Sequence, residues 1–200
     1  MPFDQDLTIL DQHHLLILSD IIKKNMEPTT NTFEIRPANK EDIPRVHELI
    51  KELAEYEKLS HMVIGTAEDL EKFSFGEHKV VHVYCGWSVQ ASGESKLIGY
   101  TLHFLNYSTF LHRPGIYLED IYIQPEFRSK GYGKKMLLHL CKIAKDNGYG
   151  RVEWQVLDWN KPSIDFYESL GAKPMKEWIQ YRLVGDGITQ CAINFDKLNV

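Results

Sequence analysis

Apolar residues follow two different spacings between residues 33 and 195. Alternation with polar residues, or a cluster of β-branched and aromatic residues, predicts a strand, whereas a spacing of three to four residues predicts a helix. Strands are predicted over residues 33–37, 80–89, 96–106, 116–123, 151–157, 179–184 and 188–195. Helices are predicted over residues 40–58, 66–73, 134–147 and 160–171. This order predicts an α/β (α+β) fold with a mixed central sheet of about seven strands flanked by helices.

The first 32 residues differ from the rest of the chain. Six aliphatic residues fall roughly on one helical face: Leu7, Leu10, Leu15, Leu18, Ile21 and Ile22. Acidic residues and histidines interrupt this apolar run, which argues against a signal peptide and a membrane span. Residues 25–32 have the composition of a linker. We expect residues 1–32 to form an amphipathic helix plus linker that packs on the domain (33–200) or on a neighbouring subunit, with a mobile tail as the alternative.

The segment R-S-K-G-Y-G, residues 128–133, joins the strand predicted over 116–123 to the helix predicted over 134–147. Two glycines at such a junction let the backbone turn tightly and leave several N–H groups pointing outward. A turn of this kind at a helix N-terminus binds an anion, most plausibly a pyrophosphate. A turn that only connects the two elements is the alternative.

Three phosphate-binding motifs can be compared with this segment. A P-loop requires Ser or Thr after its lysine, whereas Lys135 follows Lys134 here. The dinucleotide fingerprint requires a third glycine at the position of Met136. The pattern that fits is R-x-x-G-x-G, so the segment resembles the coenzyme A motif of the GNAT acetyltransferases.

Further motifs extend this resemblance from about residue 33 to residue 181. Residues 160–172 resemble the GNAT segment N-x-x-S/A-I-x-F-Y-x-x-x-G-F/A. Residues 53–57 and 117–128 look like the diamine and polyamine acetyltransferase branch of that family. Where spermidine/spermine acetyltransferases carry an acidic residue, this chain has Ser108-Thr109, and together with residues 157–160 this looks more like the thialysine branch.

The resemblance implies acetyl-CoA as co-substrate. Backbone amides from Ser129 to Lys134 would hold the pyrophosphate, and the edge of the strand at Ile121 to Ile123 would pair with the pantetheine arm. The amide of Ile123 would also polarise the thioester carbonyl. The basic side chains of this segment would add positive charge near the phosphates; the alternative is that they are only solvated. The expected cofactor-binding residues are Ile121, Tyr122, Ile123, Arg128, Ser129, Lys130, Gly131, Tyr132, Gly133, Lys134, Asn160 and Ser163.

Two residues are the predicted catalytic groups. Strand alternation sends the side chains of Glu119 and Asp120 to opposite faces, and the resemblance selects Glu119 for the substrate side. A carboxylate with a pKa of about 4.3 is too weak to deprotonate an amine with a pKa of about 10.4, so Glu119 would hold the ammonium and pass its proton through water. By resemblance, Tyr167 would protonate the departing thiolate. The structural alternatives are a surface carboxylate and a helix-anchoring aromatic ring.

The predicted activity is acetyl transfer to a primary amine of a small cation. An amine acidified by a second ammonium or a nearby sulfur suits a carboxylate site, which favours polyamines and thialysine. The resemblance gives the substrate-binding set Tyr56, Glu57, Glu119, Glu153, Trp154 and Gln155. A non-catalytic acyl-CoA sensor and a protein-lysine acetyltransferase remain the alternatives.

Composition narrows the partners. The net charge of −5, from 23 basic and 28 acidic residues, disfavours nucleic acid and mildly favours a cationic substrate. The three cysteines, Cys85, Cys141 and Cys191, lack metal-ligand spacing, and we interpret them as reduced core thiols of a cytoplasmic protein. The nine histidines lack metal spacing too, so no metal is expected. Membrane binding is not expected either, because the apolar run of residues 1–32 is interrupted. Resemblance and a predicted hairpin over residues 179–195 favour a homodimer.

Overall fold

A computed structural model describes residues 31–198. The chain divides into two units, the first ending at Gln155 and the second beginning at Val156. The first unit is built on a sheet of five strands in the order β1-β2-β3-β4-β5. The strands are β1 (Thr32–Pro37), β2 (His82–Val89), β3 (Ser95–Ser108), β4 (Arg113–Ile123) and β5 (Val152–Trp154). Neighbours from β1 to β4 pair antiparallel, and β5 runs parallel to β4.

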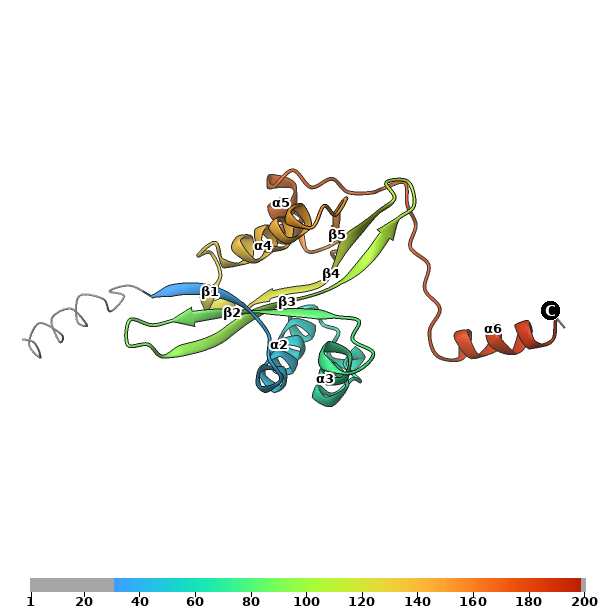
Figure 1. Cartoon of the computed structure of the whole chain (residues 1–200), viewed down its shortest axis with the longest axis horizontal. Helices are drawn as coiled ribbons and strands as arrows, with labels where there is room; N and C mark the ends of the chain where they lie inside the picture. Colours follow the sequence, from blue (N-terminus) through green and yellow to red (C-terminus); the bar gives the residue numbers. More distant parts are fainter. Residues whose placement is uncertain (1–30, 199–200) are drawn as a thin grey trace, which may run out of the picture. The chain divides into compact units, whose positions relative to one another are not determined.

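Helices cover both faces of this sheet (Figure 1). On one face lie α2 (Ile43–Tyr56), preceded by η1 (Lys40–Asp42), and α3 (Ala67–Phe75), preceded by η2 (Ser60–Met62). The other face carries α4 (Tyr132–Asp146), which follows η3 (Pro125–Phe127). Thr66 begins α3 with a capping box to Asp69, at the start of the helix predicted over residues 66–73. These helix and strand positions confirm the mixed α/β fold.

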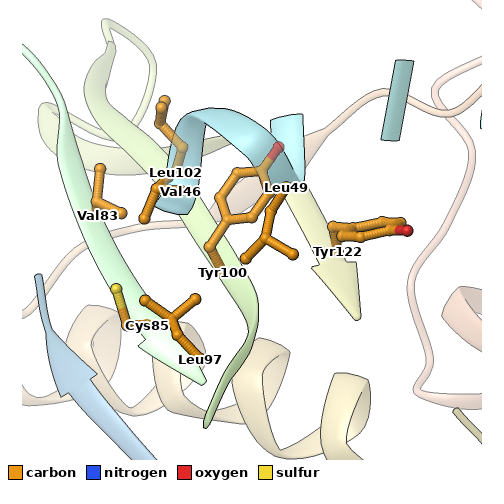
Figure 2. Packing of buried hydrophobic residues seen from close by; sticks show 8 residues of the cluster. All are labelled: Val46, Leu49, Val83, Cys85, Leu97, Tyr100, Leu102 and Tyr122. Atoms are coloured by element: carbon orange, nitrogen blue, oxygen red, sulfur yellow. The ribbon is translucent and has the colours of Figure 1, made fainter. Parts of the chain in front are cut away.

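The core on the α2 face holds two tyrosines among aliphatic side chains. Figure 2 shows the ring of Tyr100 beside Val46 and Leu49 of α2. The buried cluster consists of Val46, Leu49, Val83, Cys85, Leu97, Tyr100, Leu102 and Tyr122. On the opposite face α4 buries Met136, Leu137, Leu140 and Ala144. Each large aliphatic side chain buried in this way contributes about 1.5–3 kcal/mol, which fixes both helices to the sheet.

The pairing of β4 changes at Glu119. Leu102 of β3 lies opposite Asp120, and the next residue of β3, His103, lies opposite Leu118, so Glu119 is left over as a β-bulge. Pairing with β5 ends at the same place, where Leu118 meets Trp154. Among the described residues, no strand pairs with the β5-side edge of β4 beyond Leu118.

The second unit contains α5 (Lys161–Ser169) and α6 (Asp186–Asp196). The predicted hairpin over residues 179–195 is wrong, because residues 179–184 form no regular element and 188–195 belong to α6. Ile188, Ala192 and Phe195 are spaced by four and three residues, so this stretch fits a helix as well as a strand. The sheet therefore has five strands rather than about seven.

The predictions for the cysteines and for the N-terminal segment can be compared with the structure. All three cysteines are free, but only Cys85 is buried, so the prediction of core thiols was wrong for Cys141 and Cys191. Burial raises the pKa of the Cys85 thiol to about 12, which keeps it protonated at neutral pH. The predicted N-terminal helix lies outside the described residues, and Thr32 already begins β1. No helix in the described residues is long and apolar enough to span a bilayer.

Three histidines and one tyrosine stack on the α4 face. The ring centroid of His103 lies 5.3 Å from that of His82 and 5.9 Å from that of Tyr84, and Tyr84 meets His139 of α4 edge-on at 4.6 Å. Burial, followed by the neighbouring histidines, lowers the pKa of His103 to about 4. This cluster therefore packs best with its imidazoles neutral.

The free energy of unfolding should fall as the pH drops from about 6.5 to about 4. In this window an unfolded histidine is protonated whereas folded His103 stays neutral, a difference of roughly 3 kcal/mol in the free energy of unfolding. His103→Phe should remove this loss, as measured by urea unfolding at several pH values. His61→Gln, at an exposed histidine, should keep it.

The raised pKa of Asp120 also makes stability depend on pH, with the opposite sign. Because this contribution is the same in the parent protein and in each variant, the difference between them reports on His103. Equal losses of stability in the parent protein and in His103→Phe would contradict this account.

Candidate active site

The turn between η3 and α4 has the backbone of an anion site. Ser129 and Gly131 both have positive φ, 61° and 77°, and Gly131 is the N-cap of α4. Glycine offers no side-chain acceptor, and the first helical bond runs from the Lys135 N–H to the Gly131 carbonyl, 3.0 Å away. The amides of the first turn are therefore available to a ligand, as in phosphate-binding nests.

The glycines also leave space in front of these amides. A Cβ added to Gly131 or Gly133 would meet no protein atom within 4 Å. Gly131 needs glycine for its positive φ, but Gly133 does not, so open space is the feature that favours glycine there. The side chain of Tyr132 stacks on Phe33 of β1, with ring centroids 4.2 Å apart, and leaves its amide in the turn. The turn thus has the free amides and the open space that the predicted pyrophosphate site requires.

The open edge of β4 presents the backbone groups of alternate residues. The Gln124 N–H donates to the Ile98 carbonyl of β3 at 2.9 Å. Because the backbone N–H and C=O groups of successive residues alternate in direction, those of Ile121 and Ile123 face away from β3. They point to the edge that β5 leaves unpaired beyond Leu118. This geometry suits the predicted pairing with an extended amide-containing arm.

Three carboxyl groups gather where the bulge lies. The Tyr100 hydroxyl donates to Asp120 Oδ2 at 3.0 Å. Burial raises the pKa of Asp120 to about 6, the Tyr100 hydrogen bond opposes this, and the charges of Glu119 and Glu57 add to it. Burial also raises the pKa of Glu57, at the end of α2. This group therefore concentrates negative charge beside the bulge.

The bulge revises the reasoning about Glu119. The prediction of opposite faces assumed strict alternation, which a bulge interrupts. The Glu119 carboxylate is exposed and acts on the pKa of Asp120. Asp120 and Tyr100 were not predicted to belong to this group, because the pairing register between β3 and β4 leaves no signal in the sequence of either strand.

The predicted substrate residues of β5 differ in what they contact. The Glu153 Oε2 atom accepts a hydrogen bond from Asn106 Nδ2 at 2.6 Å and pairs with Arg151 Nε at 2.8 Å. This oxygen is thus already engaged within the sheet. Trp154 is half-buried opposite Leu118, and Gln155 is exposed just after the strand.

The Arg128 side chain contacts aromatic rings outside the turn. Its guanidinium lies over the ring of Tyr56, 4.8 Å from the centroid, and over that of Tyr122 at 5.4 Å. Lys130 lies over Phe127 at 5.2 Å, and Lys134 is exposed. The Arg128 guanidinium is thus engaged by rings of α2 and β4, and its predicted contact with the phosphates stays a prediction.

Three predicted residues belong to the second unit. Asn160 is buried as the N-cap of α5, and its side chain accepts from the Ser163 amide at 3.4 Å. Tyr167 is half-buried on α5, and its ring centroid lies 5.3 Å from that of Phe166. One role of Asn160 and of the Ser163 amide is therefore to cap α5. Within residues 31–198, no three His, Cys, Asp or Glu residues are grouped to hold a metal.

The chain is similar to known proteins over most of its length. Residues 46–172 match the model of the acetyltransferase (GNAT) family. The chain is 39% identical to a thialysine N-epsilon-acetyltransferase from Sus scrofa over 79% of this chain and 96% of that protein. It is 32% identical to an L-ornithine N5-acetyltransferase from Arabidopsis thaliana, over 83% of this chain and 89% of that protein.

Solved structures share the fold. An integron cassette protein from V. cholerae gives a TM-score of 0.65 at 24% identity, covering 80% of this chain and 97% of that one. An aminoglycoside N-acetyltransferase in complex with CoA gives 0.60 at 18% identity, covering 79% and 99%.

Gly133→Ala tests the space in front of the turn. The added methyl group meets no protein atom, so the free energy of unfolding should not fall, whereas it would intrude on a phosphate held there. We expect the Kd for coenzyme A to rise about tenfold or more by calorimetry, which corresponds to about 1.4 kcal/mol.

The matched control is Gly65→Ala, which also adds a methyl group in open space at ordinary φ and should leave the Kd unchanged. Unaltered affinity in Gly133→Ala would show that the turn does not hold the phosphates.

Proposed function

Because the chain belongs to the GNAT family of acetyltransferases, we propose that it transfers the acetyl group of acetyl-CoA to a primary amine of a small cation. Thialysine or a diamine or polyamine is the substrate class. The observation that carries the proposal is the group of carboxyls from Glu57, Glu119 and Asp120 at the start of the open edge of β4. A site for a cation thus adjoins a strand edge able to pair with an acyl carrier.

The chain's own groups would hold acetyl-CoA by its backbone. Amides of residues 129–134 would bind the pyrophosphate. The N–H and C=O groups of Ile121 and the N–H of Ile123, whose carbonyl accepts from Arg128 Nε, would face the acyl-pantetheine arm. Bound acetyl-CoA supplies an activated thioester. The Ile123 N–H, fixed in the strand, would stabilise the negative charge that develops on its carbonyl oxygen during attack.

The pKa values of the amine and of the carboxyls determine how the ammonium would lose its proton. A lysine-like ammonium has a pKa of about 10.4, well above the pKa of about 6 for Asp120, so neither this carboxyl nor Glu119 removes the proton outright. They would hold the cation and pass one proton to water. An amine already acidified by a sulfur or a second ammonium loses that proton more readily, which supports thialysine and polyamines as substrates.

Tyr167 is proposed as the general acid. A phenol with a pKa near 10 is protonated at neutral pH and can give its proton to a departing thiolate, whose conjugate acid has a pKa of about 8.5. The amine nitrogen would attack the thioester carbon directly in a ternary complex, and the C–S bond would break. The sulfur would take the Tyr167 proton, and the second proton that the nitrogen loses on becoming an amide would return through water to the phenolate.

A homodimer is the proposed assembly. Large apolar side chains of the second unit are exposed, among them Trp178 at 67% and Tyr181 at 88%. Exposed apolar surface of this kind favours a protein partner, and a second copy of the chain is the simplest one. Sedimentation of a monomer at micromolar concentration would exclude it.

Acetyl transfer itself is tested by release of free thiol from acetyl-CoA. We expect release with thialysine or with spermidine, spermine or putrescine, and much less with lysine or a histone peptide. Tyr167→Phe should lower kcat by about 10²-fold or more, because it removes only the proton donor, while the Kd for acetyl-CoA stays the same.

Tyr181→Phe, at an exposed tyrosine of the same unit, is the control and should keep full activity. Binding of acetyl-CoA without thiol release for any of these amines would instead favour an acyl-CoA sensor. Full turnover in Tyr167→Phe would remove that residue from the mechanism.

A further inference from the structure

Arg128 connects the turn to two other elements. Its Nε atom donates to the carbonyl oxygen of Ile123, the last residue of β4, at 2.9 Å. Its guanidinium plane meets the rings of Tyr56, which ends α2, and of Tyr122 in β4. The side chain is half-buried in this position. A planar guanidinium that stacks on aromatic rings while it donates a hydrogen bond is held in one orientation.

Glu52 makes a second connection between the same two elements, one helical turn earlier. Its Oε2 atom accepts from the Tyr122 hydroxyl at 3.3 Å and from Gln124 Nε2 at 3.0 Å, and Oε1 pairs with Arg45 at 3.1 Å. Gln124 is buried and directly follows β4. We call the residues Glu52, Tyr56, Tyr122, Gln124 and Arg128 the α2–β4 clamp.

The clamp joins the parts that must meet during acetyl transfer. Ile123 carries the amide proposed to polarise the thioester, and its own carbonyl is fixed by Arg128. Glu57, which follows Tyr56, is one of the carboxyls proposed to hold the amine. Transfer needs the reacting atoms about 3–3.5 Å apart, and a misplacement of about 1 Å can cost about 10²-fold in rate.

We propose that Arg128 is a positioning residue that sets the distance between the amine site at the end of α2 and the thioester site at the end of β4. This inference rests on the proposed function. It assigns the guanidinium to alignment of the amine, whereas its place in the sequence motif indicated the phosphates. Binding of acetyl-CoA in the turn would thereby also order the carboxyl end of α2.

Arg128→Lys is the sharpest variant, because it keeps the positive charge but loses the planar stacking and the Nε donor. At saturating acetyl-CoA, we expect the KM for the amine to rise about tenfold and kcat to fall. The Kd for coenzyme A should change less than about threefold, since the backbone amides hold the phosphates. A purely structural role would lower the Tm without this split between amine KM and coenzyme Kd.

Lys96→Met is the matched control. Lys96 also lies over an aromatic ring next to the turn, 5.2 Å from the centroid of Phe127, but has no contact with α2 among the described interactions. It should leave both constants unchanged. Glu52→Gln weakens the clamp from its other side and should raise the amine KM about threefold or more; it decides the matter if Arg128→Lys does not fold.

A raised Kd for coenzyme A together with an unchanged amine KM in Arg128→Lys would overturn the inference and return the guanidinium to the phosphates. An unchanged amine KM in folded Glu52→Gln would overturn it as well. If the unaltered protein acetylates no amine, the proposed function fails and the inference with it, which distinguishes that result from a failure confined to the variants.

Discussion

The separation of β4 from β5 after Leu118 is the constraint on which the site depends. A strand inside a sheet spends its N–H and C=O groups on its neighbours, whereas a strand with one free edge keeps alternate groups for a ligand. The bulge at Glu119 falls at the same point and increases the local twist. One irregularity thus coincides with both the edge proposed for an acyl carrier and the place where carboxyl groups gather.

Burial then sets the chemistry of that place. Asp120 lies against a core that contains Tyr100, and it has two acidic neighbours, so its charged form is disfavoured unless a cation approaches. A dication gains more from three carboxyls than a monocation does. The carboxyls proposed to hold the amine would also raise its pKa, and this opposition is the reason why acidified amines are proposed as the substrates.

The sequence indicated the parts that depend on local order. The R-S-K-G-Y-G turn, the caps at Thr66 and Asn160 and the first four strands follow from glycine, capping residues and periodicity. The bulge, the Tyr100–Asp120 hydrogen bond and the stacking of Arg128 on Tyr56 join residues far apart in the chain, so no local pattern reveals them. Residues 188–195 fit both periods, and the helix prevailed there.

Amide hydrogen exchange of the protein with and without coenzyme A tests most directly whether the open edge of β4 receives the acyl carrier. On binding, the amides of Ile121 and Ile123 should become protected, together with those of residues 129–134. Tyr122, which faces β3, should exchange as slowly as before. Binding of coenzyme A that leaves the exchange of Ile121 and Ile123 unaltered would contradict the account.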